Sequence, residues 1–117
     1  MYFTFPLKAI SSNSAYPTGK QGRRYLCEKG KAFKEEVGYI AKLNLPKGYK
    51  RDKVDNFEVS IHFHFEDNRR RDIDDYFKLL IDSLIGIVWD DDSQIVKLTG
   101  IKTQGNENNI QVNIKKL

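Results

Sequence analysis

The feature that most constrains this chain is the segment 57–65, in which apolar and polar side chains alternate without exception. The apolar positions are Phe57, Val59, Ile61, Phe63 and Phe65, and the polar positions are Glu58, Ser60, His62 and His64. Because successive side chains of a β-strand point to opposite faces, the pattern predicts a strand with one core face and one polar face.

Five further elements and one loop are expected around this strand. They are an edge strand over residues 2–8 broken by Pro6, a helix over 28–44, a helix over 73–85 ending before Gly86, a hairpin of strands 94–102 and 109–115 turning at residues 104–106, and a long loop over 11–22. The order strand–helix–strand–helix–strand–strand predicts an α+β fold, in which two main helices pack on a small mixed β-sheet.

Length and composition limit the class of protein. The 117 residues suit a single domain spanning 1–117, and the one cysteine, Cys27, excludes an intrachain disulfide and a Cys-rich zinc site. No apolar run approaches the roughly 20 residues that span a bilayer. The N-terminus lacks the features of a signal peptide, so a cytoplasmic protein is expected. Neither a phosphate-cradling Gly-Lys-Ser/Thr motif nor a Gly-x-Ser-x-Gly elbow is present.

The net charge of +4 is unevenly distributed along the chain. Residues 66–92 carry nine acidic and four basic side chains, which leaves sixteen basic and seven acidic side chains elsewhere. A basic body with a concentrated acidic segment suits a polyanionic partner together with a bound cation.

The acidic segment contains two clusters of aspartates. Asp72, Asp74 and Asp75 lie where the loop gives way to the second helix and where one aspartate would serve as a helix cap, and residues 90–92 are three consecutive aspartates where a turn needs only one. Capping and turn formation therefore explain part of each cluster. If the clusters converge, their carboxylates suit Mg²⁺, which prefers hard oxygen ligands and leaves positions for water and phosphate oxygens. Such a site could hydrolyse a phosphodiester.

Basic side chains surround these acids. Lys78 lies four residues after Asp74, so it could form an ordinary ion pair with it or stabilise charge on a reacting phosphate. Arg69, Arg70 and Arg71 could contact flanking DNA phosphates, and Lys20, Arg23 and Arg24 are weaker candidates for the same role.

Other side chains have simpler explanations. His62 and His64 share a strand face, but two histidines are too few for a metal site, and an exposed polar face explains them better. Tyr16, Tyr25 and Trp89 could stack on exposed bases, although an aromatic side chain in a small domain is more often part of the core.

Two stretches resemble the RusA family of Holliday junction resolvases, which are small bacterial and phage endodeoxyribonucleases. These are Arg-Arg-Arg-Asp-Ile-Asp-Asp-Tyr-Phe-Lys at 69–78 and Trp-Asp-Asp-Asp-Ser-Gln-Ile at 89–95. The family pattern has a basic pair, Asp-hydrophobic-Asp-Asn, a lysine four positions after the second Asp, and then Asp-Asp-small-Gln-hydrophobic. A weaker likeness extends upstream to Arg24-Tyr25-Leu26, Gly30, Ala32 and Phe33.

The resemblance implies a homodimer that resolves four-way DNA junctions by paired symmetric nicks, with Mg²⁺ as cofactor and Mn²⁺ as a substitute, in recombination and repair. The catalytic residues it implies are Asp72, Asp74, Asp92 and Lys78, and the metal ligands it implies are Asp72, Asp74, Asp91 and Asp92. Asp92 is favoured among the three consecutive acids because it directly precedes the Ser-Gln pair.

The chain departs from the family pattern in two places. Asp75 stands where the family has Asn, and residues 9–13 keep only part of the family's Pro-Pro-Ser-x-Asn segment. Asp75 and Asp90 are left without an assigned role. Two other functions stay open: an inactive module that binds branched DNA, and a nuclease for other branched DNA such as flaps.

Overall fold

The computed structural model describes all residues, 1–117. Its sheet has four strands in the order β1-β4-β2-β3. The strands are β1 (Tyr2–Phe5), β2 (Phe57–Phe65), β3 (Ile95–Gln104) and β4 (Asn109–Lys116). The helices are α1 (Ser12–Ala15), α2 (Glu28–Asn44) and α3 (Phe77–Ser83), and the 3-10 turns are η1 (Lys20–Gly22), η2 (Ile73–Tyr76) and η3 (Asp92–Gln94).

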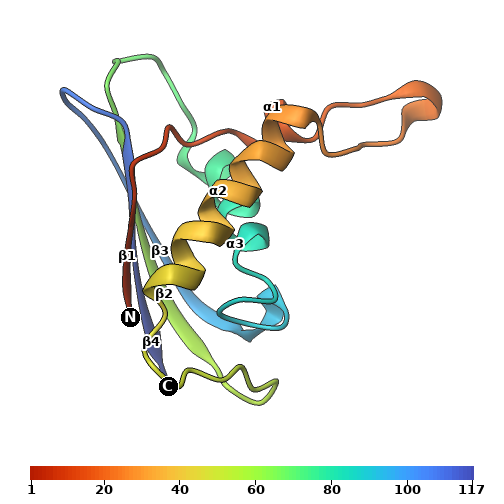
Figure 1. The fold of residues 1–117 in the computed structure, drawn as a ribbon. Helices are drawn as coiled ribbons and strands as arrows, with labels where there is room; N and C mark the ends of the chain where they lie inside the picture. The colour runs from red at the N-terminus through yellow and green to blue at the C-terminus, as the bar shows by residue number, and fades with distance from the viewer.

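The helices α2 and α3 lie on one face of the sheet, as Figure 1 shows. All five apolar side chains of β2 are buried under them, and Phe33, Val37 and Ala41 of α2 contribute to the same core. Trp89 is 1% exposed and its ring lies 5.7 Å from that of Phe57. The alternation in β2 therefore has the predicted result, a core beneath one face, and the α+β fold is confirmed.

The opposite face of the sheet is polar. His62 Nε2 and His64 Nδ1 both lie 2.6 Å from Thr103 Oγ1 on the neighbouring strand β3. The two histidines are half-buried and no third ligand joins them in a metal-binding cluster. The prediction that they belong to a polar sheet face is confirmed.

The predicted hairpin of the last two strands is wrong. β3 is parallel to β2 and β4 is antiparallel to it, so β2 lies between them and the connection crosses over its end. The Gly105 N–H closes this crossover by donating to the Phe65 carbonyl at 2.9 Å. A Cβ on Gly105 would lie 2.5 Å from His64 Nε2, so a larger residue here would force the His64 ring to move.

Several boundaries also differ from expectation. The helix predicted over 73–85 is a 3-10 turn, η2, followed by the short helix α3, and the 11–22 loop contains α1 and η1. The first strand stops before Pro6 and pairs only with β4, so it is an edge strand as predicted. No helix has the length and apolar character needed to cross a membrane.

Candidate active site

The loop before α3 presents two aspartates that do not cap a helix. Asp72 has extended backbone angles and occupies the position before η2, but its side chain makes no capping hydrogen bond. Asp74 lies within η2, is exposed, and forms no ion pair or hydrogen bond through its carboxylate. Capping, which alone could have explained these acids, is therefore not what these two side chains do.

The three consecutive aspartates at 90–92 differ in their surroundings. Asp90 pairs with Arg51 at 2.9 Å, and the Asp91 side chain accepts a hydrogen bond from Ser93 N at 3.1 Å. The hydrogen bonds from Ser93 hold the pKa of the Asp91 carboxyl below its usual value. Asp92 is exposed and has neither kind of partner. Two of the three acids therefore have structural partners, and Asp92 is free to bind something else.

A buried glutamine fixes the turn that presents these acids. The Gln94 side chain accepts hydrogen bonds from the backbone N–H groups of Asp90 and Asp91, at 2.8 and 3.1 Å. It donates to the carbonyls of Asp52 and Asp55, at 2.8 and 2.9 Å. Gln94 is only 6% exposed, so it ties the acidic turn to the loop before β2.

A groove of about 400 Å³ brings part of the predicted site together. Asp74, Lys78 and Asp92 line it together with Asp82, and Phe77, Ile81, Ile95 and Leu98 supply its apolar wall. Asp72 and Asp91 do not line this groove. Each acidic cluster thus contributes one residue to the groove: Asp74 precedes α3 in the sequence, and Asp92 follows α3 and the loop after it.

Lys78 is paired with an acid that the sequence analysis did not single out. Its Nζ lies 3.1 Å from Asp82 Oδ2, one turn later on α3, and it makes no ion pair with Asp74. The Tyr16 hydroxyl donates to the same Asp82 oxygen at 2.9 Å. Burial, and then the hydrogen bond to Asp82, raise the pKa of Tyr16 to about 12. The sequence did offer one indication of this pair, because Asp82 lies four residues after Lys78 and such residues are neighbours on a helix.

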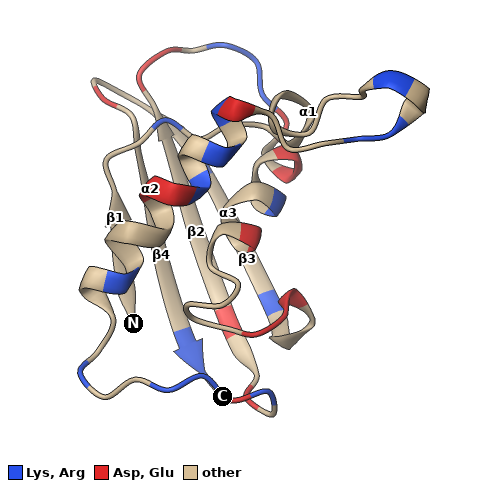
Figure 2. Cartoon of the chain, turned by 45° about the vertical axis from the view of Figure 1, so that its right-hand side comes forward, with Lys and Arg blue, Asp and Glu red and all other residues tan.

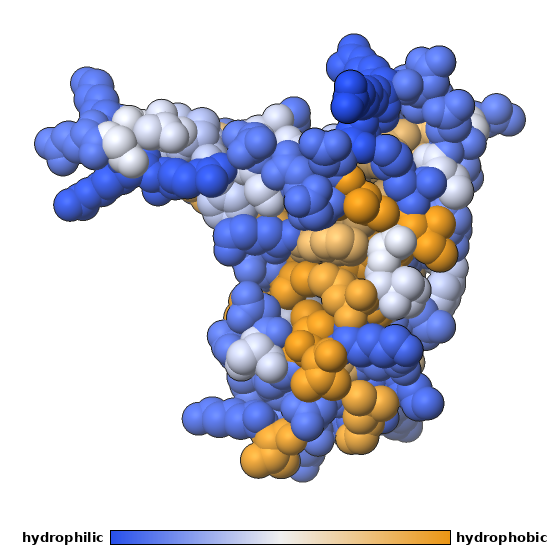
Figure 3. Space-filling view, turned by 180° about the vertical axis from the view of Figure 1, so that it is seen from behind, coloured by the Kyte–Doolittle hydropathy of each residue, from blue (hydrophilic) through white to orange (hydrophobic).

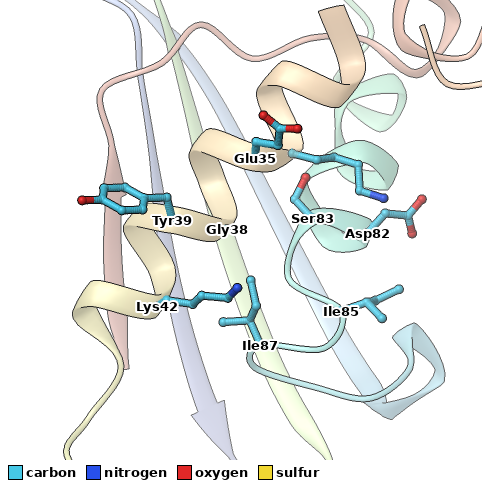
Figure 4. Close-up of a pocket in the computed structure, with 9 residues that line it drawn as sticks. Glu35, Gly38, Tyr39, Lys42, Asp82, Ser83, Ile85 and Ile87 are labelled. Atoms are coloured by element: carbon cyan, nitrogen blue, oxygen red, sulfur yellow. The ribbon is translucent and has the colours of Figure 1, made fainter. Parts of the chain in front are cut away.

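Asp82 also borders a second, larger groove between α2 and α3. This groove, of about 650 Å³, is shown in Figure 4, where Glu35, Tyr39 and Lys42 project from α2 and Asp82 projects from α3. None of the predicted catalytic or metal-binding residues lines it. The largest hollow of the surface is therefore not where the predicted site lies.

The three arginines before Asp72 are not equivalent. Arg71 is largely buried, lies 2.6 Å from Asp67 through its Nη1, and places its guanidinium 4.0 Å from the centre of the Phe65 ring. The hydrogen bond between them raises the pKa of Arg71 and lowers that of Asp67 well below its usual range. Arg69 and Arg70 are exposed and form no ion pair. Arg71 thus holds the loop in place, whereas Arg69 and Arg70 remain available to an anion.

The other predicted DNA-binding residues lie on a projecting arm. Residues 17–25 extend away from the helices, and the basic positions lie near its tip (Figure 2). Lys20 and Arg23 are exposed, and Arg24 Nε donates to the Tyr16 carbonyl at 2.8 Å. Of the three aromatic side chains considered for base stacking, Trp89 is in the core and Tyr16 binds Asp82, while Tyr25 is 53% exposed on this arm.

The side chains facing the groove are compatible with Mg²⁺. No three acidic, histidine or cysteine side chains of the chain gather closely enough to hold a metal ion. Asp74 and Asp92 nevertheless face one groove with exposed, unpartnered carboxylates. Mg²⁺ is commonly held by one or two carboxylates, with water and substrate phosphates as the remaining ligands. The donor set fits an ion that takes its other ligands from outside this chain.

Comparison with known proteins gives a consistent result. The sequence model of the family described as Endodeoxyribonuclease RusA matches residues 6–115. The chain is 31% identical over 99 residues to the crossover junction endodeoxyribonuclease RusA of Escherichia coli strain K12, and 30% identical over 99 residues to that of Enterobacteria phage 82. The corresponding Shigella sonnei strain Ss046 protein is 31% identical. Each alignment covers 78% of this chain and 74% of the relative.

Proposed function

The chain belongs to the RusA family of endodeoxyribonucleases, and on that premise we propose that it resolves four-way (Holliday) DNA junctions by paired symmetric nicks. The family is one of nucleases, so the protein is an enzyme that cuts DNA. Its relatives come from bacteria and a phage, and the proposed setting is recombination and repair in the bacterial cytoplasm.

One observation carries this proposal: Asp74 and Asp92, which are 18 positions apart in the sequence, face the same groove together with Lys78. Asp74 and Asp92 would hold Mg²⁺, for which Mn²⁺ is the expected substitute. When bound, the ion supplies Lewis-acid polarisation of the scissile phosphate and of the attacking water. The parts proposed for Asp72 and Asp91 are supported by the family resemblance alone, because neither lines the groove.

The chain's own cation has a separate role in the proposed reaction. Lys78 lines the groove, and its ammonium can donate to a non-bridging phosphate oxygen, where it offsets the negative charge that develops as the phosphodiester is cut. Asp82 and Tyr16 keep the ammonium at the groove wall, through the ion pair and through the aromatic ring 5.5 Å from Nζ. Lys78 is therefore proposed as a catalytic residue, and Asp82 as a residue that positions it.

The surface supports a homodimer as the working form. β3 is an edge strand with one unpaired side, and outside the groove it exposes Val96 and Ile101. Figure 3 shows apolar side chains gathered in a band on the side of the molecule opposite to the view of Figure 1. Exposed apolar side chains on a free strand edge are a favourable surface for association. A two-fold dimer would also present two equivalent sites to a roughly two-fold junction.

A cleavage assay on labelled four-way junctions tests the proposal. With Mg²⁺, the protein should make two symmetric nicks near the branch point, and Asp74→Asn should abolish cutting while junction binding persists. Asp75→Asn is the matched control, since it makes the same chemical change at the next position. That variant should still cut.

The same assay separates the alternatives. Junction binding without cutting under every divalent metal would identify a DNA-binding module that has lost activity. Flaps and forks cut faster than four-way junctions would identify a nuclease for other branched DNA. Undiminished cutting by Asp74→Asn would remove this groove from the mechanism.

A further inference from the structure

A third, smaller hollow shares the turn η2 with the candidate active site. It has a volume of about 290 Å³ and is enclosed by the segment after β1, the first turn of α2 and the loop before Asp72. η2 contributes to both places, because Asp74 of this turn lines the catalytic groove and Tyr76 of the same turn lines the hollow. The Tyr76 ring is packed against Phe65, with ring centres 5.3 Å apart.

The hollow is strongly basic. Five cationic side chains line it and no acidic side chain does; the five are Lys8, Lys29, Arg69, Arg70 and Arg71. Two hydroxyl groups, those of Ser11 and Ser14, complete its polar lining. We call this hollow the basic pocket. Its residues come from three separate parts of the sequence, which is why neither Lys8 nor Lys29 stands out in the sequence alone.

The positive charge of the basic pocket is only partly neutralised within the protein. One carboxylate outside the lining, Asp67, lies 2.6 Å from Arg71 and 3.6 Å from Lys8. Lys29, Arg69 and Arg70 form no ion pair. Three cations held around one hollow repel one another, so an anion placed between them would be favoured.

We propose that the basic pocket is a phosphate-binding subsite that holds one backbone phosphodiester of a junction arm, outside the scissile position. Guanidinium forks, an ammonium and hydroxyl donors are the groups that recognise phosphate oxygens. The inference rests on the proposed function for the identity of the DNA. Since η2 carries both Asp74 and Tyr76, a phosphate seated in the pocket fixes the strand relative to the catalytic groove.

The first test measures how DNA binding depends on salt. Lys29→Ala and Arg70→Ala remove exposed, unpaired side chains, so neither should disturb folding. Binding to a four-way junction without divalent metal should weaken, and the slope of log Kd against log salt should fall by about 1 for each variant. Lys47→Ala is the control, because Lys47 is exposed just beyond the opposite end of α2. It should leave the slope unchanged.

The second test identifies the phosphate. Replacing single phosphodiesters by neutral methylphosphonates should reveal one position on a junction arm where the wild type loses on the order of tenfold in affinity. At that position the Lys29→Ala, Arg70→Ala double variant should lose nothing further. The subsite would be overturned if every methylphosphonate position cost the same affinity. It would also be overturned if the slope of log Kd against log salt were unchanged in the Lys29→Ala and Arg70→Ala variants.

The source of the phosphate is distinguished by a third comparison. Junctions with and without 5′-terminal phosphates should show the same effect of Lys29→Ala; an effect confined to phosphorylated ends would replace the backbone by a terminal phosphate and overturn the proposal. Failure of the subsite and failure of the proposed function give different results. A protein that binds junctions without cutting them can still lose affinity at one methylphosphonate position, and the subsite then stands without the function. A protein that cuts junctions but shows no such position keeps its function and loses the subsite.

Discussion

The ammonium of Lys78 lies between two acids with different environments. Asp82 is half-buried, holds Lys78 at 3.1 Å and also accepts the Tyr16 hydrogen bond, whereas Asp74 on the preceding turn is exposed and unpaired. An i,i+4 pair on an exposed helix contributes only about 0.3–0.5 kcal/mol, so the pair matters little for stability. Its consequence is geometric: Lys78 is turned away from Asp74, and the Asp74 carboxylate stays free.

We expect Asp82→Asn to impair cutting more than binding. Without the carboxylate, Lys78 loses the partner that directs it along the groove wall, and kcat should fall by about tenfold, an effect of roughly 1.4 kcal/mol on the barrier. Junction affinity should not fall, because the substitution removes a carboxylate that repels DNA phosphates.

A second measurement distinguishes positioning from general damage. The pKa of Tyr16 should fall below about 12 in the Asp82→Asn variant, because the hydrogen bond and the negative charge that favour the protonated phenol are gone. It should stay above 10.0, since burial is the largest cause of the shift. Absorbance titration of the tyrosines, with Tyr16→Phe to assign the signal, checks both limits. An unchanged Tyr16 titration would contradict the arrangement described for Asp82.

At the level of elements, the turn formed by residues 90–94 is held by side-chain contacts, and only Asp92 in it has a carboxylate without a partner. η3 begins at Asp92, directly after Asp91, which caps it, and Gln94 closes a reciprocal set of hydrogen bonds with the backbone before it. A single 3-10 turn is weak in isolation, so its position depends on those side-chain contacts.

Gln94→Ala is therefore expected to destabilise the fold. The change leaves two backbone N–H groups and two carbonyls without their partner, and we expect a loss of about 2–4 kcal/mol in the free energy of unfolding. Ser93→Ala on the same turn is the control, because Ser93 is exposed and its backbone N–H is retained. Urea denaturation of the three proteins measures the difference. Equal midpoints for Gln94→Ala and Ser93→Ala would show that the turn is held in another way.

Local periodicity predicted those parts of the fold that depend on one segment. The helix 28–44 was placed with its observed bounds, and the strand 57–65 was placed likewise, because each pattern reports the burial of its own side chains. The pairing of β3 and β4 was missed. Two strands joined by a short connection usually pair, and nothing in residues 94–115 signals that β2 lies between them.

In the candidate site, too, the sequence predicted the local features and missed those that depend on packing between distant segments. Spacing and family resemblance selected Asp74, Asp92 and Lys78, which do share a groove. They could not reveal that Gln94 accepts hydrogen bonds from the backbone N–H groups of Asp90 and Asp91, or that Tyr16 reaches Asp82 across 66 positions of sequence. They also could not assemble Lys8 and Lys29 with the arginines, because that juxtaposition depends on how α2 and the loop before η2 pack.

For the whole molecule, the fold arranges the opposing charges around one turn. η2 contributes Asp74 to the acidic groove and Tyr76 to the basic pocket. A polyanion is repelled by unoccupied carboxylates, so basic residues next to them can compensate by holding the neighbouring phosphates. The arm that carries Lys20 and Arg23 extends this basic surface away from the body (Figure 2).

The proposed dimer gives the last prediction. Val96 is 57% exposed on β3, at the bulge opposite Phe57 and Glu58, and it does not line the catalytic groove. Val96→Glu would bury a charge if a second copy covers this edge, and such burial is costly without a partner. We therefore expect the wild type to sediment as a dimer at micromolar concentration and Val96→Glu as a monomer. Val54→Glu is the control, because Val54 is 80% exposed in the loop before β2.

The two oligomeric states should also give different products from a supercoiled plasmid that extrudes a cruciform. Two nicks made within the lifetime of one complex give a linear molecule, whereas single nicks give a relaxed circle, which no longer holds the cruciform for a second cut. We expect linear product from the wild type and from Val54→Glu, and mostly nicked circles, formed slowly, from Val96→Glu. A Val96→Glu protein that stays dimeric would place the interface elsewhere. A monomeric one that still yields linear product at the wild-type rate would separate paired cutting from dimerisation, because one active site would then be making both cuts.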